Sequence, residues 1–181
     1  MPRYLPVQLD AASEEMKSVY AEVENEVGLV PNFIKTLAHS PHHLKPVADL
    51  YRSMMKPGSL GQKIHQLIIL KTCKVDKCKV TAARHTDLAR EAGWTDEQLE
   101  AMDSYAESDL FNHYEKDAME LVELVLGRPD DISQQQFWTQ LDNHFTSDQV
   151  VEMITLIGFF NMINRFVLAV EVDPDPVPST A

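Results

Sequence analysis

A cysteine and a histidine lie seven residues apart in the stretch CKVTAARH, which runs from Cys78 to His85. Residues three, four and seven apart share one face of a helix, so Cys78, Thr81 and His85 are predicted to line one stripe. A thiolate attacks peroxides, disulfides or acyl groups, and an imidazole can take up the proton of the thiol. The spacing fits a working thiol–imidazole pair, and it also fits two buried side chains that only share a face.

The surroundings of Cys78 favour its ionised form. The cysteine lies near the first turn of a predicted helix, where exposed N–H groups and the helix dipole stabilise an anion. Between residues 71 and 84 the chain carries five basic residues against one acid, Asp76, although its formal net charge is -12. The basic residues are Lys71, Lys74, Lys77, Lys79 and Arg84.

The second cysteine, Cys73, shares a predicted helix face with apolar residues and is interpreted as structural. On a continuous helix Cys73 and Cys78 are too far apart for a disulfide, whose Cα atoms lie within about 7 Å of each other. Only a break in the segment KVDK, residues 74–77, could bring the two thiols together. A zinc site made of Cys73, Cys78 and His85 matches no standard spacing, so we expect neither a metal nor a cofactor.

The bulk composition is that of a soluble globular protein, with 44% apolar and 24% charged residues. An acidic chain repels phosphate groups, so nucleic acid and anionic membranes are poor partner candidates. Two cysteines exclude a disulfide framework and favour a reducing compartment. The N-terminus has no long apolar segment of the signal-peptide type, and we therefore expect a cytoplasmic protein.

Helical periods dominate the chain and predict one all-α domain of about seven to eight helices over residues 1–181. The pairs Ser59–Gln62 and Thr95–Gln98 are predicted capping boxes, and Asp76 is predicted to cap the helix that begins near Cys78. The predicted helix stops are Gly28 with Pro31, Pro57 with Gly58, Gly93, and Gly127 with Pro129.

The most apolar stretch, residues 150–170, contains Glu152, Asn161, Asn164 and Arg165. These polar groups indicate a central core helix rather than a membrane span. The three residues Asn161, Asn164 and Arg165 are predicted to satisfy one another, to form a subunit contact or to line a pocket. The tail, residues 171–181, is rich in acids and prolines and is predicted to be loose.

The stretch KIHQLIILKTCKVDKCKVTAARHTDLAREAGWTDEQLEAM resembles the core of the AhpD-like, or carboxymuconolactone decarboxylase, family. That core has an apolar helix opened by an acidic residue, a turn, the pattern C-x-x-C-x-x-x-H-x-x-x-A-x-x-x-G and a short helix. The motif core spans about 40–125, and the segments before and after it also resemble the family. The resemblance implies an AhpD-like helical fold and a homo-oligomer, a trimer or a hexamer.

The resemblance also implies roles for four positions. The hydroperoxidase branch uses two cysteines, of which the second reacts, and a histidine and a glutamate that relay its proton. In this chain the first cysteine falls on Cys78 and the histidine on His85, whereas Thr81 and Gln66 stand at the second cysteine and the glutamate. A threonine cannot close a disulfide, and a glutamine cannot take up a proton near neutral pH.

Three functions remain open from the sequence. The first is an AhpD-like thiol-dependent peroxidase, an antioxidant oxidoreductase with Cys78 as the single reacting thiol and His85 as base, resolved by an external thiol or by Cys73. The second is a decarboxylase-like lyase for a small carboxylic acid or lactone, with His85 as the acid–base group and with Thr81 and Gln66 as hydrogen-bonding partners of the substrate. The third is a non-catalytic family member.

Overall fold

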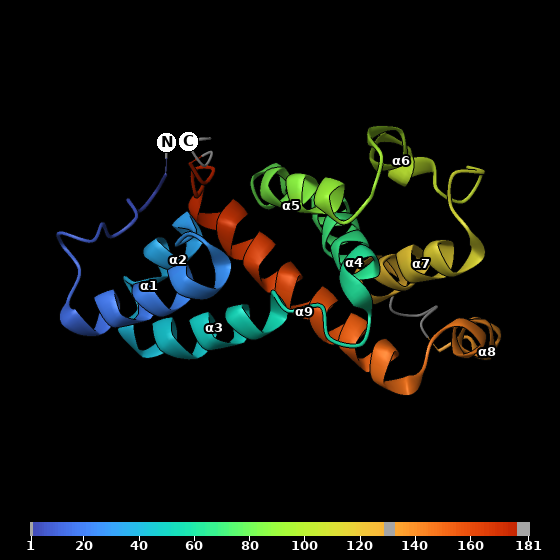
Figure 1. Cartoon of the computed structure of the whole chain (residues 1–181), viewed down its shortest axis with the longest axis horizontal. Coiled ribbons are helices and arrows are strands. Elements are labelled where there is room, and N and C mark those ends of the chain that lie inside the picture. Colours follow the sequence, from blue (N-terminus) through green and yellow to red (C-terminus); the bar gives the residue numbers. More distant parts are fainter. Residues whose placement is uncertain (1, 129–132, 177–181) are drawn as a thin grey trace. The chain divides into compact units, whose positions relative to one another are not determined.

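The computed structural model describes residues 2–128 and 133–176, and all regular secondary structure in these ranges is helical. The all-α prediction is therefore confirmed. The number of helices is larger than predicted, because short segments such as residues 32–37 and 96–101 form helices of their own. The elements are α1 (Glu14–Val27), α2 (Asn32–Leu37), α3 (Pro41–Met54), α4 (Gly61–Asp76), α5 (Lys79–Glu91), α6 (Asp96–Ala101), a 3-10 helix (Met102–Ser104), α7 (His113–Gly127), α8 (Gln135–His144) and α9 (Ser147–Val170) (Figure 1).

The chain divides into two compact units. Unit 1 comprises residues 1–56 and 166–181, and unit 2 comprises residues 57–165, so the boundary between them falls inside α9. The candidate residues Gln66, Cys78, Thr81 and His85 all belong to unit 2. The prediction of one domain over the whole chain stays a prediction.

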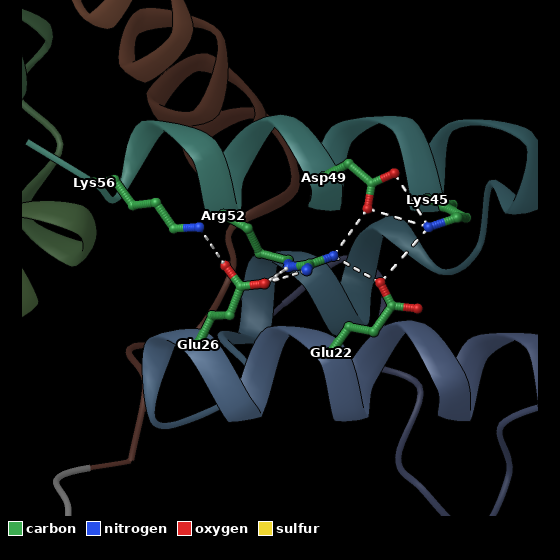
Figure 2. A network of polar contacts seen from close by, with 6 residues as sticks. All are labelled: Glu22, Glu26, Lys45, Asp49, Arg52 and Lys56. Atoms are coloured by element: carbon green, nitrogen blue, oxygen red, sulfur yellow. Dashed lines mark hydrogen bonds and ion pairs between the residues drawn. The ribbon is translucent and has the colours of Figure 1, made fainter. Parts of the chain in front are cut away.

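In unit 1, α1 and α2 both pack against α3. One face of α1 is buried, with Val19, Tyr20 and Val23 in the core. Gly28 ends α1 in the left-handed conformation (φ 84°) and donates its N–H to the carbonyl of Glu24, which confirms the predicted stop. Between these two helices, Arg52 of α3 pairs with Glu22 and Glu26 of α1, with Lys45, Asp49 and Lys56 beside it (Figure 2).

The first residues of the acidic tail contact α2 within unit 1. The backbone N–H of Asn32 donates to Asp175 Oδ1 at 2.6 Å, and the Asn32 side chain donates to the carbonyls of Asp173 and Pro174. Residues 177–181 of the tail that was predicted to be loose lie outside the described residues, as does Pro129 of the predicted helix stop.

In unit 2, α4 packs against both α5 and α7. Most of α4 is buried on every side, which its apolar run Leu67, Ile68, Ile69 and Leu70 explains. The buried residues of this helix also include polar ones, among them His65, Gln66 and Thr72. Buried polar groups require hydrogen-bond partners, so α4 is the element that positions the candidate site.

One predicted capping box is confirmed and another is wrong. Thr95 and Gln98 form the reciprocal pair of bonds that begins α6. Ser59 does not cap α4, because its N–H and hydroxyl both donate to Glu152 Oε2 of α9 at 2.8 Å. The same carboxylate lies against Gly58, whose left-handed backbone conformation (φ 51°) favours glycine at this turn.

Among the described residues, α9 is the one helix whose length and composition would allow it to cross a membrane. Its most apolar stretch is 44% buried in the protein. The residues of α9 that belong to unit 2 include buried Met153, Phe160 and the polar Asn164. A buried asparagine with side-chain partners is typical of a helix in a protein core.

Candidate functional site

The two cysteines meet at the turn between α4 and α5. Helix α4 ends at Asp76, and Lys77 follows in the left-handed conformation (φ 58°). The N–H of Lys77 donates to the carbonyl of Lys74 at 3.0 Å, and the N–H of Cys78 donates to the carbonyl of Cys73 at 2.9 Å. These two bonds form a Schellman motif, in which the last residue and the residue five positions before it are neighbours. The break in the segment 74–77 that the sequence left open is therefore present.

Cys78 occupies the N-cap position of α5, directly before Lys79. Its Sγ lies 3.3 Å from the hydroxyl oxygen of Thr81, one turn further along the helix. The first N–H groups of a helix have no partner within the helix and, with the helix dipole, they favour an anion at this end. Cys78 itself is buried, with 1% of its surface exposed, whereas Thr81 is only partly buried.

His85 and Gln66 form the second half of the site. The Nδ1 of His85 lies 2.9 Å from Oε1 of Gln66, and Nε2 of Gln66 lies 3.4 Å from Nδ1 of His65. An amide oxygen only accepts, so His85 carries its proton on Nδ1 and donates it to Gln66, which in turn donates to His65. This arrangement leaves the Nε2 of His85 as an unprotonated base. The edge of the Phe160 ring packs against His85 with centroids 5.0 Å apart.

Burial keeps the His85 ring neutral. Desolvation, followed by the charge of Arg84 and the neighbouring His65, lowers the pKa of His85 from 6.5 to about 3. A glutamate in place of Gln66 would oppose this effect by favouring the imidazolium form. The amide at position 66 thus holds a neutral imidazole in one tautomer.

The Cys73 thiol has polar partners of its own. Its Sγ lies 3.8 Å from Oδ1 of Asn164, and Nδ2 of Asn164 donates to Oδ2 of Asp76 at 2.9 Å. Burial, the neighbouring Cys78 thiol and the charge of Asp76 raise the pKa of Cys73 far above its ordinary value, whereas the Asn164 hydrogen bond lowers it slightly. Cys73 is therefore a protonated thiol at neutral pH.

Asp76 does not cap α5, as the sequence predicted. Its fully buried carboxylate accepts from Asn161 at 2.7 Å and from Asn164, and it pairs with Arg165 at 3.1 Å. The three polar residues of α9 thus converge on Asp76 at the end of α4, which corrects the predicted cap. The residue that satisfies all three is Asp76, a shared partner that the sequence did not indicate, and the predicted subunit contact stays a prediction.

The positive field predicted around Cys78 is partly neutralised by acids from other elements. Lys71 pairs with Glu123 of α7 at 2.6 Å and lies over the ring of Tyr105. Lys74 pairs with Asp103 at 3.1 Å. The sequence segment alone showed the cations but not these distant partners, so the net positive charge near Cys78 is smaller than the sequence indicated.

The structure brings the four candidate residues into two pairs, Cys78 with Thr81 and His85 with Gln66. Among the described residues no hydrogen bond joins Cys78 to His85 directly. A proton that moves between them passes through the Thr81 hydroxyl, which lies on the same face of α5 one turn before His85, or through a water.

Sequence reasoning missed His65 and Phe160 as parts of the site. The signal for His65 was its place beside Gln66 in an otherwise apolar helix, since two adjacent polar residues there must bond to something buried. Phe160 carries no such signal, because an aromatic residue in an apolar helix is normally core. Within the described ranges no group of three His, Cys, Asp or Glu side chains is placed to hold a metal.

A separate cavity of about 420 Å³ in unit 2 is lined by residues other than the four candidates. His144 lies at this cavity, and its Nδ1 donates to the buried carboxylate of Asp117 at 2.5 Å. Gln140 donates to the other oxygen of Asp117. This pair ties α8 to α7, which explains why α8 packs there.

Comparison with known proteins begins with the sequence. No family model matches the chain. A curated relative, the uncharacterized protein YdfG of Bacillus subtilis (strain 168), is 24% identical over 130 residues, which are 72% of this chain and 88% of that protein.

Solved structures show the same fold. A peroxidase-related protein of Silicibacter sp. TM1040 is 20% identical with a TM-score of 0.78, over 94% of this chain and 90% of that chain. The debrominase Bmp8 without ligand is 16% identical with a TM-score of 0.76, over 94% and 91%. A protein of unknown function from Agrobacterium tumefaciens, described as a candidate antioxidant defence protein AhpD, is 20% identical with a TM-score of 0.71, over 78% and 96%.

Proposed function

We propose, from the AhpD-like fold that this chain has, that it is a thiol-dependent oxidoreductase in which Cys78 is the reacting thiol. The observation that carries the proposal is the placement of Cys78 at the start of α5, with its sulfur 3.3 Å from the Thr81 hydroxyl. A thiolate at this place is stabilised by the helix end and by the hydroxyl, which donates to it. The similar structures described as peroxidase-related or as AhpD proteins favour a hydroperoxide as substrate.

The proposed reaction begins with proton loss from Cys78. His85 accepts the proton at Nε2, through Thr81 or a water, while Gln66 holds the ring by Nδ1. The Cys78 thiolate then attacks the nearer peroxide oxygen, the O–O bond breaks, and the leaving alkoxide takes a proton and departs as an alcohol. Cys78 is oxidised to a sulfenic acid, and a thiol must reduce it back.

A peroxide pulse tests the proposal. The protein is treated briefly with one equivalent of cumene hydroperoxide, its thiols are blocked, and the oxidation state of each cysteine is read by mass spectrometry. We expect Cys78 to be oxidised selectively, and the Cys78→Ser variant to consume no peroxide. Oxidation of Cys78 no faster than that of free cysteine would contradict the proposal.

Debromination is a related reaction for the same thiol. A cysteine-to-alanine variant of the debrominase Bmp8 was solved in complex with 2,3,4-tribromopyrrole and has a TM-score of 0.77 against this chain. In a thiol-dependent debromination the sulfur takes the bromine, the ring carbon takes a proton, and two external thiols then release bromide and become a disulfide. Bromide release from 2,3,4-tribromopyrrole with excess thiol, lost in Cys78→Ser, would establish this substrate.

A lyase that acts on a small carboxylic acid or lactone is the second candidate function. It is favoured by the neutral His85, which Gln66 keeps in one tautomer and which could act as a base without any thiol. The Cys78→Ser variant separates the two functions, because a lyase of this kind keeps its activity in the variant and a thiol oxidoreductase loses it.

The assembly and location belong to the same proposal. The proposed assembly is a homo-oligomer, a trimer or a hexamer, as the family resemblance implies. The proposed location is the cytoplasm, which the cysteine count and the N-terminal sequence favour, and an external thiol is the proposed reductant. Light scattering on the purified protein gives the oligomer number directly, and a monomer at micromolar concentration would remove this part of the proposal.

A further inference from the structure

We propose that Cys73 is the resolving thiol of this protein and that it forms a reversible disulfide with Cys78 across the turn between α4 and α5. The inference rests on the proposed thiol chemistry of Cys78 and adds the residue that completes its cycle. In this assignment the redox pair is C-x-x-x-x-C, formed by the end of one helix and the start of the next. The pair replaces the partner thiol that Thr81 cannot supply.

The first support is the backbone of the turn. The hydrogen bond from the N–H of Cys78 to the carbonyl of Cys73, at 2.9 Å, holds the two residues together. In a Schellman motif the side chains at these two positions commonly contact each other. On a continuous helix the same two residues would point away from each other, so the left-handed Lys77 is the residue that makes the pair possible.

The second support is the environment of the two sulfurs. Both cysteines are free and each has 1% of its surface exposed. The charge of Cys78 is among the causes that raise the pKa of Cys73, so the two thiols interact electrostatically. Each thiol also has its own polar partner, Thr81 for Cys78 and Asn164 for Cys73.

The third support is that the two thiols are chemically different. Cys73 is held protonated by burial and donates its S–H toward Asn164, whereas Cys78 lies at a helix start that favours an anion. Cys78 is therefore the thiol that attacks first. Cys73 remains a thiol and reacts only after Cys78 has been oxidised to a sulfenic acid, whose sulfur is electrophilic.

The resolving step balances without any further reactant. The Cys73 sulfur attacks the sulfur of the Cys78 sulfenic acid, the S–O bond breaks, and the leaving hydroxide takes the Cys73 proton and departs as water. The product is the Cys73–Cys78 disulfide, in which both sulfurs are oxidised. Two equivalents of an external thiol, or one dithiol, return both cysteines to thiols and leave as a disulfide.

The experiment uses the full chain and reads the two thiols separately. Proteolysis on the N-terminal side of aspartates cuts before Asp49, Asp76 and Asp87, and so places Cys73 and Cys78 on different peptides. The protein is treated with diamide in one arm and with one equivalent of cumene hydroperoxide in the other. Dimedone is present in a parallel sample to trap sulfenic acid, and remaining thiols are blocked before digestion under non-reducing conditions.

We expect both oxidants to link the two peptides in the wild-type protein. In Cys73→Ser we expect the dimedone adduct at Cys78 to increase several-fold, and turnover with excess thiol to become prone to inactivation by overoxidation. The matched control is Thr72→Ser, which alters the adjacent buried side chain of α4, keeps its hydroxyl and leaves both thiols in place.

The outcomes separate the two proposals. In one outcome, peroxide oxidises Cys78 selectively, the two peptides are not linked, and the dimedone adducts are equal in wild type and Cys73→Ser. This outcome overturns the role of Cys73 and leaves the proposed function standing. Linked peptides with diamide but no oxidation of Cys78 by peroxide keep the thiol pair and overturn the peroxidase proposal. The diamide arm needs no variant, so a folding defect of Cys73→Ser cannot hide the result.

Discussion

At the scale of single residues, the proposed chemistry depends on which of the buried side chains carry a proton and on which atom the proton sits. His85 keeps its proton on Nδ1 because Gln66 accepts it, and Cys73 keeps its proton because it is buried. The spacing of Cys78, Thr81 and His85 on one helix face could be predicted from the sequence, since 3.6 residues complete a turn. The His65–Gln66–His85 chain could not, because it joins residues 19 positions apart on two helices.

Acid destabilises the protein through His85. The pKa of His85 is lowered to about 3 in the folded protein, whereas in the unfolded chain it has its ordinary value of 6.5. The unfolded state therefore binds a proton first, so stability is fully present above pH 6.5 and falls as the pH drops toward 3. Between pH 7 and 5 this costs about 2 kcal/mol. Urea unfolding at both pH values measures the loss, and His85→Gln should show a smaller one.

A carboxylate at position 66 should reverse the state of His85. In Gln66→Glu the nearby negative charge favours the imidazolium form, so the pKa of His85 should rise well above the wild-type value. The variant also restores a group that can take up a proton. Imidazole chemical shifts followed from pH 3 to 8 measure the pKa, and Gln66→Met, which removes the acceptor for His85 and the donor to His65 without adding a charge, is the control. An unchanged His85 titration in Gln66→Glu would show that Gln66 does not govern this ring.

At the scale of elements, the turn between α4 and α5 is held from α9. Asp76 is the last residue of α4, and its buried carboxylate binds Asn161, Asn164 and Arg165. From the sequence, Asp76 was assigned to the cap of the following helix and Ser59 to the cap of α4. Both assignments were wrong for the same reason. The actual partners are side chains of α9, more than 80 residues away: Glu152 for Ser59 and Asn161 for Asp76. Thr95 and Gln98 were predicted correctly because both partners of that cap lie within four residues.

Removal of the Asp76 carboxylate should destabilise unit 2 strongly. In Asp76→Ala the side chain of Asn164, which is fully buried, loses its acceptor and cannot turn to water. We expect a loss of about 3 kcal/mol in the free energy of unfolding. Arg165→Ala is the matched control, because the Arg165 side chain is 66% exposed and its ion pair should contribute less than about 1 kcal/mol. Chemical denaturation of both variants provides the comparison, and equal losses would contradict the assignment.

At the scale of the whole molecule, the all-α composition and the AhpD-like fold were both predictable. The helical period and the motif around Cys78 are local properties of the chain, and the similar structures agree with them. The division into two units was not predictable, because it places the end of α9 with residues from the start of the chain. The charge network of unit 1 was hidden for the same reason, since it pairs α1 with α3 (Figure 2).

The unit 1 network should contribute stability that depends on pH. Hydrogen bonds from Arg52, and then from Lys56, lower the pKa of Glu26 below its ordinary 4.5. Its contribution is present above that value and is lost as the pH falls below it, when the carboxylate is protonated. Arg52→Met should therefore lower the melting temperature at pH 7 and change it much less at pH 3. Lys17→Met, which removes the exposed pair with Glu14, is the control and should have little effect at either pH.

The left-handed Lys77 changes how cysteine spacing is interpreted in other chains. When a helical pattern covers two cysteines with four residues between them, a disulfide between the two is usually rejected. Where a helix ends between them as α4 does here, a backbone hydrogen bond joins the two residues, which is the arrangement on which the proposed thiol pair rests. Sequences of this fold that have lost the second motif cysteine can therefore be searched for a thiol five positions upstream. A chain that has a cysteine neither at the second motif position nor five positions upstream of the first would need a thiol from a partner molecule to complete the same cycle.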